Sequence, residues 1–226
     1  MTTKKIKDYI NKGVRHIKHR KGFGVHSPFA YSIITDVIEE RNQYYAYSAM
    51  KRIYAQNAPI SFKYACLLLR LANRFRSRQI LEVHNDGGYS LLPLILTDSR
   101  NSLISLATQQ QRDVTVAHLS WLKERVGQVT FEESYTSIAP DYKADMILVS
   151  DVPQGMSKAD LAQWLFDHTH ENTLILVKGI RPRDPLEGLW DELTDNESIE
   201  ITMDLYDYGL AIRRPRFFKQ HYIVSF

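Results

Sequence analysis

The chain has 226 residues, of which 44% are hydrophobic and 24% charged, a composition ordinary for a globular protein and long enough for one α/β domain with an N-terminal extension. Its single cysteine, Cys66, excludes an internal disulfide. No apolar run reaches the roughly 18 residues of a membrane span, and the N-terminus lacks the apolar core of a secretory signal. We therefore expect a cytoplasmic protein without a membrane span.

The first 21 residues carry eight Lys and Arg against one acid, which leaves a net charge of −4 on the remainder. Apolar residues recur among them at helical spacing and predict a basic amphipathic helix: Ile6, Tyr9, Ile10, Val14 and Ile17. One role for such an arm is contact with nucleic acid or another anionic partner. The alternative is a helix docked on the domain with a solvated basic face, which we favour because no RNA-binding or helix-turn-helix signature follows.

The segment after two glycines predicts a second helix over Pro28 to Glu40, because Ser27 can cap it and proline suits the first turn. His26 stands beside this cap as a weak candidate for a ligand or base. A third helix holds an aromatic cluster that we interpret as packing and not as a base-stacking platform: Tyr44, Tyr45, Tyr47 and Tyr54.

A fourth helix is predicted after the capping residue Ser61. Its apolar face has helical spacing and is formed by Phe62, Ala65, Cys66, Leu69 and Ala72. Cys66 lies on this face, so we expect a buried structural thiol.

The stretch from Gln79 to Leu96 predicts a strand, a tight loop and a helix. An apolar run over Ile80 to Val83 is followed by a polar, glycine-bearing break at His84 to Gly88, and a second apolar run starts at Ser90. Such a loop leaves backbone N–H groups free at a helix N-terminus beside the carboxyl end of a strand, where open sheets bind ligands. The dinucleotide pattern GxGxxG is absent, so the ligand class is open at this point.

Strands and helices alternate through the rest of the chain. Apolar runs predict four more strands at Ser102 to Ala107, Val129 to Glu132, Asp145 to Val149 and Thr173 to Val177. The helices between and after them are predicted over Val114 to Val126, after the cap Ser157, and around Leu186, Leu189, Trp190 and Leu193.

The C-terminal segment predicts a hairpin from Ile199 to Leu205 and Leu210 to Arg213, with its turn around Gly209, and a last strand at Tyr222 to Phe226. The alternation implies a mostly parallel sheet with right-handed crossovers, and the hairpin adds an antiparallel edge. The predicted fold class is therefore α/β.

Several ordered segments resemble class I S-adenosylmethionine (SAM) dependent methyltransferases. In one bacterial group of that family, an HSPF segment (here His26 to Phe29) precedes an LLRLAN-like helix (Leu68 to Asn73) and an ILE strand (Ile80 to Glu82). Their C-terminal segments are also similar to DLYDYGLAI and KQHYIVSF of this chain. The resemblance implies a Rossmann-like methyltransferase domain over residues 79–226, an N-terminal helical extension over 1–78, and SAM as cofactor.

The resemblance also implies a cofactor site at the carboxyl edge of the sheet, where this chain departs from the family pattern. The family loop reads E-x-G-x-x-x-G, but His84 stands at the first glycine, and Ala107 replaces the acid that binds the ribose. The fourth strand ends at Ser150 and not at an acid, and Lys178 replaces one of an acidic pair after the fifth. The residues carried over to cofactor binding are Glu82, His84, Asp86, Gly87, Gly88, Ser90, Ala107 and Ser150.

Three residues are weak candidates for a catalytic base: His84, Asp151 and His26. His84 has the best position, at the mouth of the loop, although a histidine there could equally fill the cofactor site. Because Lys178 removes an expected ligand, we predict no metal.

Two functions stay open at the level of sequence. One is a SAM-dependent methyltransferase whose acceptor, a small molecule or a macromolecule, the residues do not identify. The other is a catalytically inactive relative that keeps the fold as a binding or scaffolding protein, with the basic arm contacting an anionic partner. Binding of SAM despite His84 and Ala107 would distinguish them.

Overall fold

The computed structural model describes residues 11–226 except 12, 16–17, 20–21, 56 and 183. Most of the basic amphipathic helix predicted over Ile6 to Ile17 lies outside these residues. No helix in the described part of the chain is long and apolar enough to cross a membrane.

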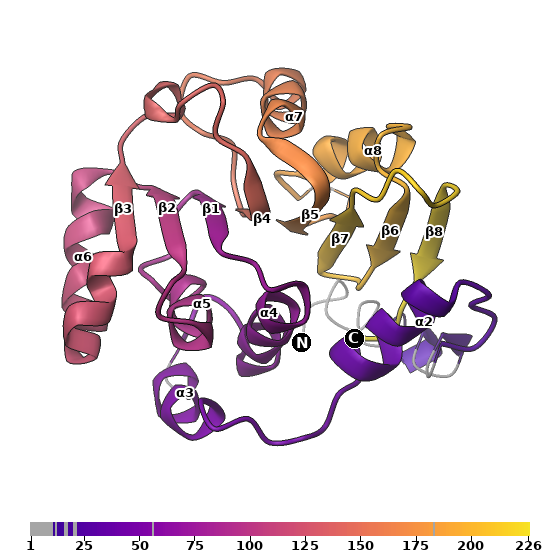
Figure 1. The fold of residues 1–226 in the computed structure, drawn as a ribbon, viewed down its shortest axis with the longest axis horizontal. Coiled ribbons are helices and arrows are strands. Elements are labelled where there is room, and N and C mark those ends of the chain that lie inside the picture. The colour runs from indigo at the N-terminus through magenta and orange to yellow at the C-terminus, as the bar shows by residue number, and fades with distance from the viewer. Residues whose placement is uncertain (1–10, 12, 16–17, 20–21, 56, 183) are drawn as a thin grey trace.

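The described residues form one eight-stranded sheet in the order β3-β2-β1-β4-β5-β7-β6-β8 (Figure 1). Only β7 runs antiparallel to its neighbours, and every other pairing is parallel. The predicted mostly parallel sheet with an antiparallel C-terminal hairpin is confirmed. The strands are β1 (Gln79–Val83), β2 (Ser102–Leu106), β3 (Val129–Glu132), β4 (Ala144–Val149), β5 (Thr169–Lys178), β6 (Ile201–Asp204), β7 (Tyr208–Ile212) and β8 (Gln220–Ile223).

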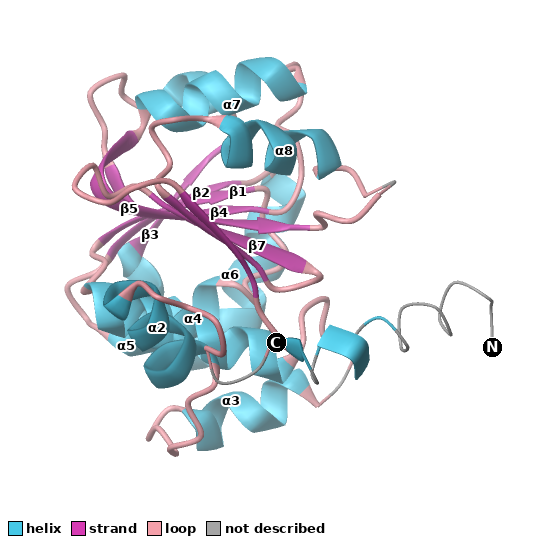
Figure 2. Ribbon diagram, turned by 90° about the vertical axis from the view of Figure 1, so that its right-hand side faces the viewer, coloured by secondary structure: helices cyan, strands magenta, loops and turns pink. Residues whose placement is uncertain are grey.

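Helices cover both faces of the sheet, with α7 and α8 on one side and α2 to α6 on the other (Figure 2). The α-helices are α2 (Pro28–Ile33), α3 (Tyr47–Tyr54), α4 (Phe62–Phe75), α5 (Leu91–Thr97), α6 (Gln109–Leu119), α7 (Lys158–Asp167) and α8 (Glu187–Asp195). The π-helix η1 (Ile34–Ile38) and the 3-10 helices η2 (Ser120–Gln128) and η3 (Tyr135–Ser137) complete the set. The three predicted caps, Ser27, Ser61 and Ser157, each accept a hydrogen bond from the backbone three residues on.

Alternating residues of the central strands feed two separate cores. Ile80 of β1 and Met146 of β4 pack with α4 and α5, whereas Leu81 and Ile147 pack with α7 and α8. Side chains of a strand point alternately to opposite faces, so strands covered on both sides are apolar at most positions. That requirement explains the uninterrupted apolar runs in the sequence. The division at residue 78 falls between α4 and β1, but α4 contributes to the same core as β1.

Arg70 is buried in α4 and joins the first helices to the domain. Its Nε donates to the carbonyl of Val37 at 2.6 Å, and Nη2 donates to the carbonyl of Ile38 at 3.2 Å. Its Nη1 donates to Tyr47 Oη at 3.0 Å. The carbonyls at the end of η1 would otherwise be buried without partners. The helix predicted over Pro28 to Glu40 changes to π geometry at Ile34 and ends at Ile38, where Arg70 binds its last carbonyls.

The predicted packing roles of Cys66 and of the tyrosines can now be compared with the structure. Cys66 is 5% exposed, and burial raises its pKa. Tyr47 and Tyr54 both contact the Phe62 ring, so these two are packing residues. The packing role predicted for Tyr45 is wrong, because its side chain is fully exposed.

The helix predicted over Val114 to Val126 is displaced in the structure. It begins at Gln109, because Thr108 and Gln111 form a capping box, and it ends at Leu119. The following 3-10 segment is interrupted at Lys123, whose φ of 51° and ψ of −119° are not helical. The apolar periodicity alone did not indicate either boundary.

The turn of the C-terminal hairpin does not lie at Gly209 as predicted. Gly209 is inside β7, and Tyr206, with φ of 78°, occupies the left-handed position in the turn. A Cβ on Gly209 would overlap the ring of Trp190 in α8. Glycine is needed here for close packing and not for a turn.

Arg15 connects the basic N-terminal segment to the end of β6. Its guanidinium forms a two-pronged ion pair with Asp204, with both N–O distances at 2.8 Å, and Arg181 contacts the same carboxylate at 2.5 Å. Burial alone would raise the pKa of Asp204, but these hydrogen bonds outweigh it and hold the pKa below its ordinary value. At least this one positive charge of the arm is used inside the molecule.

We predict opposite effects of the same change at two glycines. Gly209→Ala should destabilise the protein by about 1–3 kcal/mol or more, because its Cβ has no room beside Trp190. Gly188→Ala, in α8 with no atom within 4 Å of the new Cβ, should stabilise it by about 0.5–1 kcal/mol. Urea unfolding of both variants checks this, and equal effects would contradict the packing account.

We also predict that Arg70→Met lowers the free energy of unfolding by about 3 kcal/mol, since it strands several buried hydrogen-bonding groups at once. The matched control is Arg74→Met, on the exposed side of the same helix, which should change stability by about 0.5 kcal/mol or less. If both variants unfold at the same urea concentration, Arg70 does not hold η1 in place.

Candidate functional site

The loop after β1 is tied to both neighbouring strands. The backbone N–H of Asn85 donates to the carbonyl of Leu106 in β2 at 3.1 Å, and Ser150 Oγ, after β4, donates to the carbonyl of His84 at 3.0 Å. His84 has φ of 75°, a left-handed conformation that normally selects glycine. The loop thus keeps a glycine-like backbone at this position, while the histidine side chain is exposed.

A buried polar network lies under this loop. The Nδ2 of Asn85 donates to Glu82 Oε2 at 3.0 Å and to Ser105 Oγ at 2.9 Å, while its Oδ1 accepts from Gly87 N at 2.8 Å and Thr115 Oγ1 at 2.7 Å. Ser105 Oγ in turn donates to Glu82 Oε2 at 2.5 Å. The network joins β1, β2 and α6 beneath the loop.

Glu82 is 2% exposed, and burial raises its pKa well above the ordinary value. The charge of Asp86 raises it further, whereas the hydrogen bonds from Ser105 and Asn85 lower it. Its Oε1 has no hydrogen-bond partner among the described residues. An unpartnered buried carboxyl oxygen of this kind adds to the cost of the ionised form.

Asp86 binds Ser90, the residue that precedes the helix α5. The Asp86 carboxylate accepts from Ser90 N at 2.9 Å and from Ser90 Oγ at 2.7 Å. These bonds satisfy a donor at the start of α5 and place negative charge at its positive end.

The two glycines of the loop differ in what surrounds them. A Cβ on Gly88 would lie 2.9 Å from Thr115 Cγ2 and 3.0 Å from Leu119 Cδ1, so Gly88 allows α6 to approach. At Gly87 the nearest atom would be 3.6 Å away, and the carbonyl of this residue contacts His118 Nδ1 at 2.8 Å.

A pocket of about 670 Å³ opens beside this loop, at the carboxyl ends of β1, β2, β3 and β4. Its size is within the usual range of small-molecule sites. The polar or charged side chains on its wall include Thr108, Gln110, Glu133, Ser134 and Asp151, and the less polar ones include Leu106, Ala107, Tyr135 and Val152.

The structure brings three of the predicted site residues together on the wall of one pocket. These are His84, Ala107 and Asp151. The predicted residues Glu82, Asp86, Gly87, Gly88 and Ser90 are not among the lining residues. Ser150 faces the loop and is not among the lining residues. His26, at the start of α2, does not line this pocket either. Lys178 is directed elsewhere, since its Nζ donates to the carbonyl of Pro59 at 3.2 Å.

Sequence reasoning missed the residues that follow β2 and β3, namely Thr108, Glu133 and Ser134. Carboxyl ends of parallel strands share one edge, so their place immediately after predicted strands was the signal. The interior residues Asn85, Ser105 and Thr115 gave no comparable signal, because buried polar residues are recognisable only once their partners are known. Among the described residues, no three His, Cys, Asp or Glu side chains gather as metal ligands do.

No protein-family model and no curated protein matches the chain. Solved structures do match, all at low sequence identity. One is the O-methyltransferase TomG from Streptomyces achromogenes in complex with SAM, at a TM-score of 0.56 and 16% identity over 76% of this chain and 91% of that one. A methyltransferase from Geobacter sulfurreducens matches at a TM-score of 0.58 and 14% identity, over 81% of this chain and 96% of that one.

The O-methyltransferase from Bacillus cereus in complex with SAH matches at a TM-score of 0.54 and 16% identity, over 82% of this chain and 96% of that one. Similarity at this level shows the fold. The Rossmann-like class I methyltransferase fold expected from the sequence is confirmed.

We predict that His84→Gly raises the stability of the protein by about 1 kcal/mol, because glycine adopts φ of 75° without the steric cost borne by other residues. His84→Ala is the matched control: it removes the imidazole but retains the Cβ, so it should leave thermal stability nearly unchanged. Equal stabilisation by both variants would show that the ring, and not the backbone, is the source of strain.

Proposed function

We propose that this chain is a SAM-dependent methyltransferase that holds the nucleoside part of SAM in the pocket beside the β1 loop. The observation that carries the proposal is the place of that pocket, at the carboxyl ends of four parallel strands of a methyltransferase fold. The similar TomG structure contains SAM, and the similar structure from Bacillus cereus contains SAH.

The residues on the pocket wall fit a nucleoside. Leu106, Tyr135 and Val152 supply apolar and aromatic surface for a base. Ala107 offers no carboxylate for the ribose, but Glu133 and Asp151 line the same pocket and can accept hydrogen bonds from hydroxyl groups. The backbone of His84 is left-handed, a conformation that is otherwise typical of glycine.

Bound SAM would supply an activated methyl group, and the chain would contribute position and exclusion of water. The Asn85 network fixes the loop against β2 and α6, which gives a rigid wall on one side of the pocket. His84 and Asp151 both reach the pocket and are our candidates for a base, if the acceptor carries a proton. The acceptor itself is a small molecule or a macromolecule.

A second candidate function is a catalytically inactive binding protein built on the same fold. The absence of an acid at Ala107 favours it, since a carboxylate there is the usual partner of the ribose in the family that the chain resembles. The two candidates differ in one measurable property, which is binding of SAM.

We expect calorimetric titration of the protein with SAM and SAH to give saturable binding, with micromolar affinity corresponding to about −8 kcal/mol. Ala107→Asp should tighten it about tenfold by adding a charged acceptor. Ser134→Trp should abolish it by filling the pocket, whereas Thr130→Trp, on the exposed side of β3, should not. If neither the wild type nor Ala107→Asp binds SAM, the result contradicts the methyltransferase proposal and favours the catalytically inactive binding protein.

A further inference from the structure

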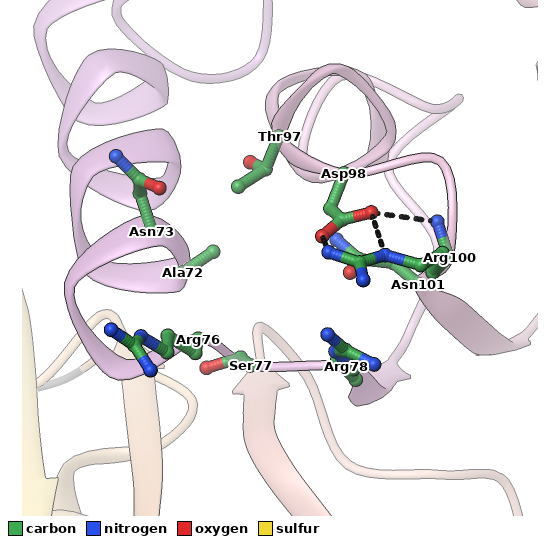
Figure 3. A pocket seen from close by; sticks show the side chains of 9 residues that line it. All are labelled: Ala72, Asn73, Arg76, Ser77, Arg78, Thr97, Asp98, Arg100 and Asn101. Atoms are coloured by element: carbon green, nitrogen blue, oxygen red, sulfur yellow. Dashed lines mark hydrogen bonds and ion pairs between the residues drawn. The ribbon is translucent and has the colours of Figure 1, made fainter.

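A second pocket, of about 310 Å³, lies at the opposite edge of the sheet (Figure 3). Ser77 and Arg78 precede β1, and Asn101 precedes β2, so this pocket opens at the amino ends of the strands. The five residues of β1 separate it from the nucleoside pocket by roughly 16 Å. It is therefore a separate feature from the proposed methyltransferase site.

Three arginines line this pocket: Arg76, Arg78 and Arg100 (Figure 3). Arg100 is committed to Asp98, with Nε–Oδ1 at 3.0 Å and Nη2–Oδ2 at 2.7 Å. The guanidinium groups of Arg76 and Arg78 have no hydrogen-bond or ion-pair partner among the described residues. The lining groups thus carry an excess of two positive charges.

Negative groups near the pocket do not cancel this excess. Asp98 is neutralised by Arg100, and the charge of Arg78 also acts on it. Asp145 accepts from the backbone N–H groups of Arg78 and Gln79, at 2.7 and 2.9 Å, and contacts His170 Nε2 at 2.9 Å. At the end of α4, two carbonyls that would oppose an anion already accept bonds from the backbone of Arg76 and Ser77.

The floor of the pocket contains buried polar atoms that lack partners. Ser77 is 2% exposed and its Oγ makes no hydrogen bond with a described residue. Asn101 is 3% exposed, and its Oδ1 is likewise unpartnered, although its Nδ2 donates to the carbonyl of Leu94 at 3.1 Å. Leaving a buried hydroxyl without a partner costs free energy, and a ligand group that binds it removes that cost.

We propose that this pocket binds a phosphate group, held by Arg76 and Arg78 with a hydrogen bond from Ser77. Guanidinium groups match the oxygens of phosphate in charge and geometry, and a serine hydroxyl donates to the same oxygens. The phosphate belongs either to a small phosphorylated molecule or to a nucleic-acid backbone, and both present the same chemistry to the pocket. This inference does not depend on SAM binding.

The test is calorimetric titration with inorganic pyrophosphate. The wild type should bind it, and Arg76→Gln and Arg78→Gln should each weaken binding about tenfold or more. The control is Arg74→Gln, an exposed arginine of the same α4 turn that does not line the pocket, and it should bind as the wild type does. Ser77→Ala should also weaken binding while leaving the unliganded protein equally or more stable.

Absence of pyrophosphate binding up to about 1 mM would overturn the proposal. Equal weakening by Arg74→Gln would overturn it as well, since that result means diffuse surface charge. A short single-stranded oligonucleotide distinguishes the two sources of phosphate: displacement by pyrophosphate supports a nucleic-acid backbone, and no oligonucleotide binding supports a small molecule. Arg78→Gln should bind SAM as the wild type does. Failure of the phosphate proposal can therefore be distinguished from failure of the SAM proposal.

Discussion

The side-chain amide of Asn85 is the group on which the organisation of the carboxyl edge depends. It makes two donor bonds and two acceptor bonds, which is its full capacity in this setting, and it does so while almost completely buried. Because the four partners belong to β1, β2, the loop and α6, a shift of any one element would leave a polar atom unpaired. A buried amide whose donors and acceptors are all bonded restricts the arrangement of the elements around it. This network also holds one wall of the pocket beside the loop in place.

The elements that could be predicted from the sequence are those set by repetition. Strands β1, β4 and β5 follow from apolar runs, because a strand covered on both faces is apolar at most positions. Ser27, Ser61 and Ser157 were identifiable as caps because capping needs only a local side chain. The position of the candidate site also followed, since the strand, loop and helix of residues 79–97 fix where a ligand can approach.

What could not be predicted depends on partners distant in sequence. Gly209 looked like a turn residue until Trp190 was seen against it, and the π geometry of η1 needs Arg70 from another helix. His84 departs from the family loop in its side chain, and its left-handed backbone became visible only with the structure. Arg76 and Arg78 gave no signal of a binding site in the sequence, because the unpartnered hydroxyl of Ser77 becomes visible only with the fold.

The ion pair between Arg15 and Asp204 has a consequence for how the basic arm can be studied. Asp204 is 7% exposed, so deleting the arm would remove one of its two guanidinium partners and weaken the end of β6. Loss of partner binding in a truncated protein would then mix damage to the fold with loss of the arm. Charge reversal at individual lysines on the arm leaves Arg15 in place and separates the two effects. Arg15 is therefore part of the folded domain, and a truncation that removes it also changes the end of β6.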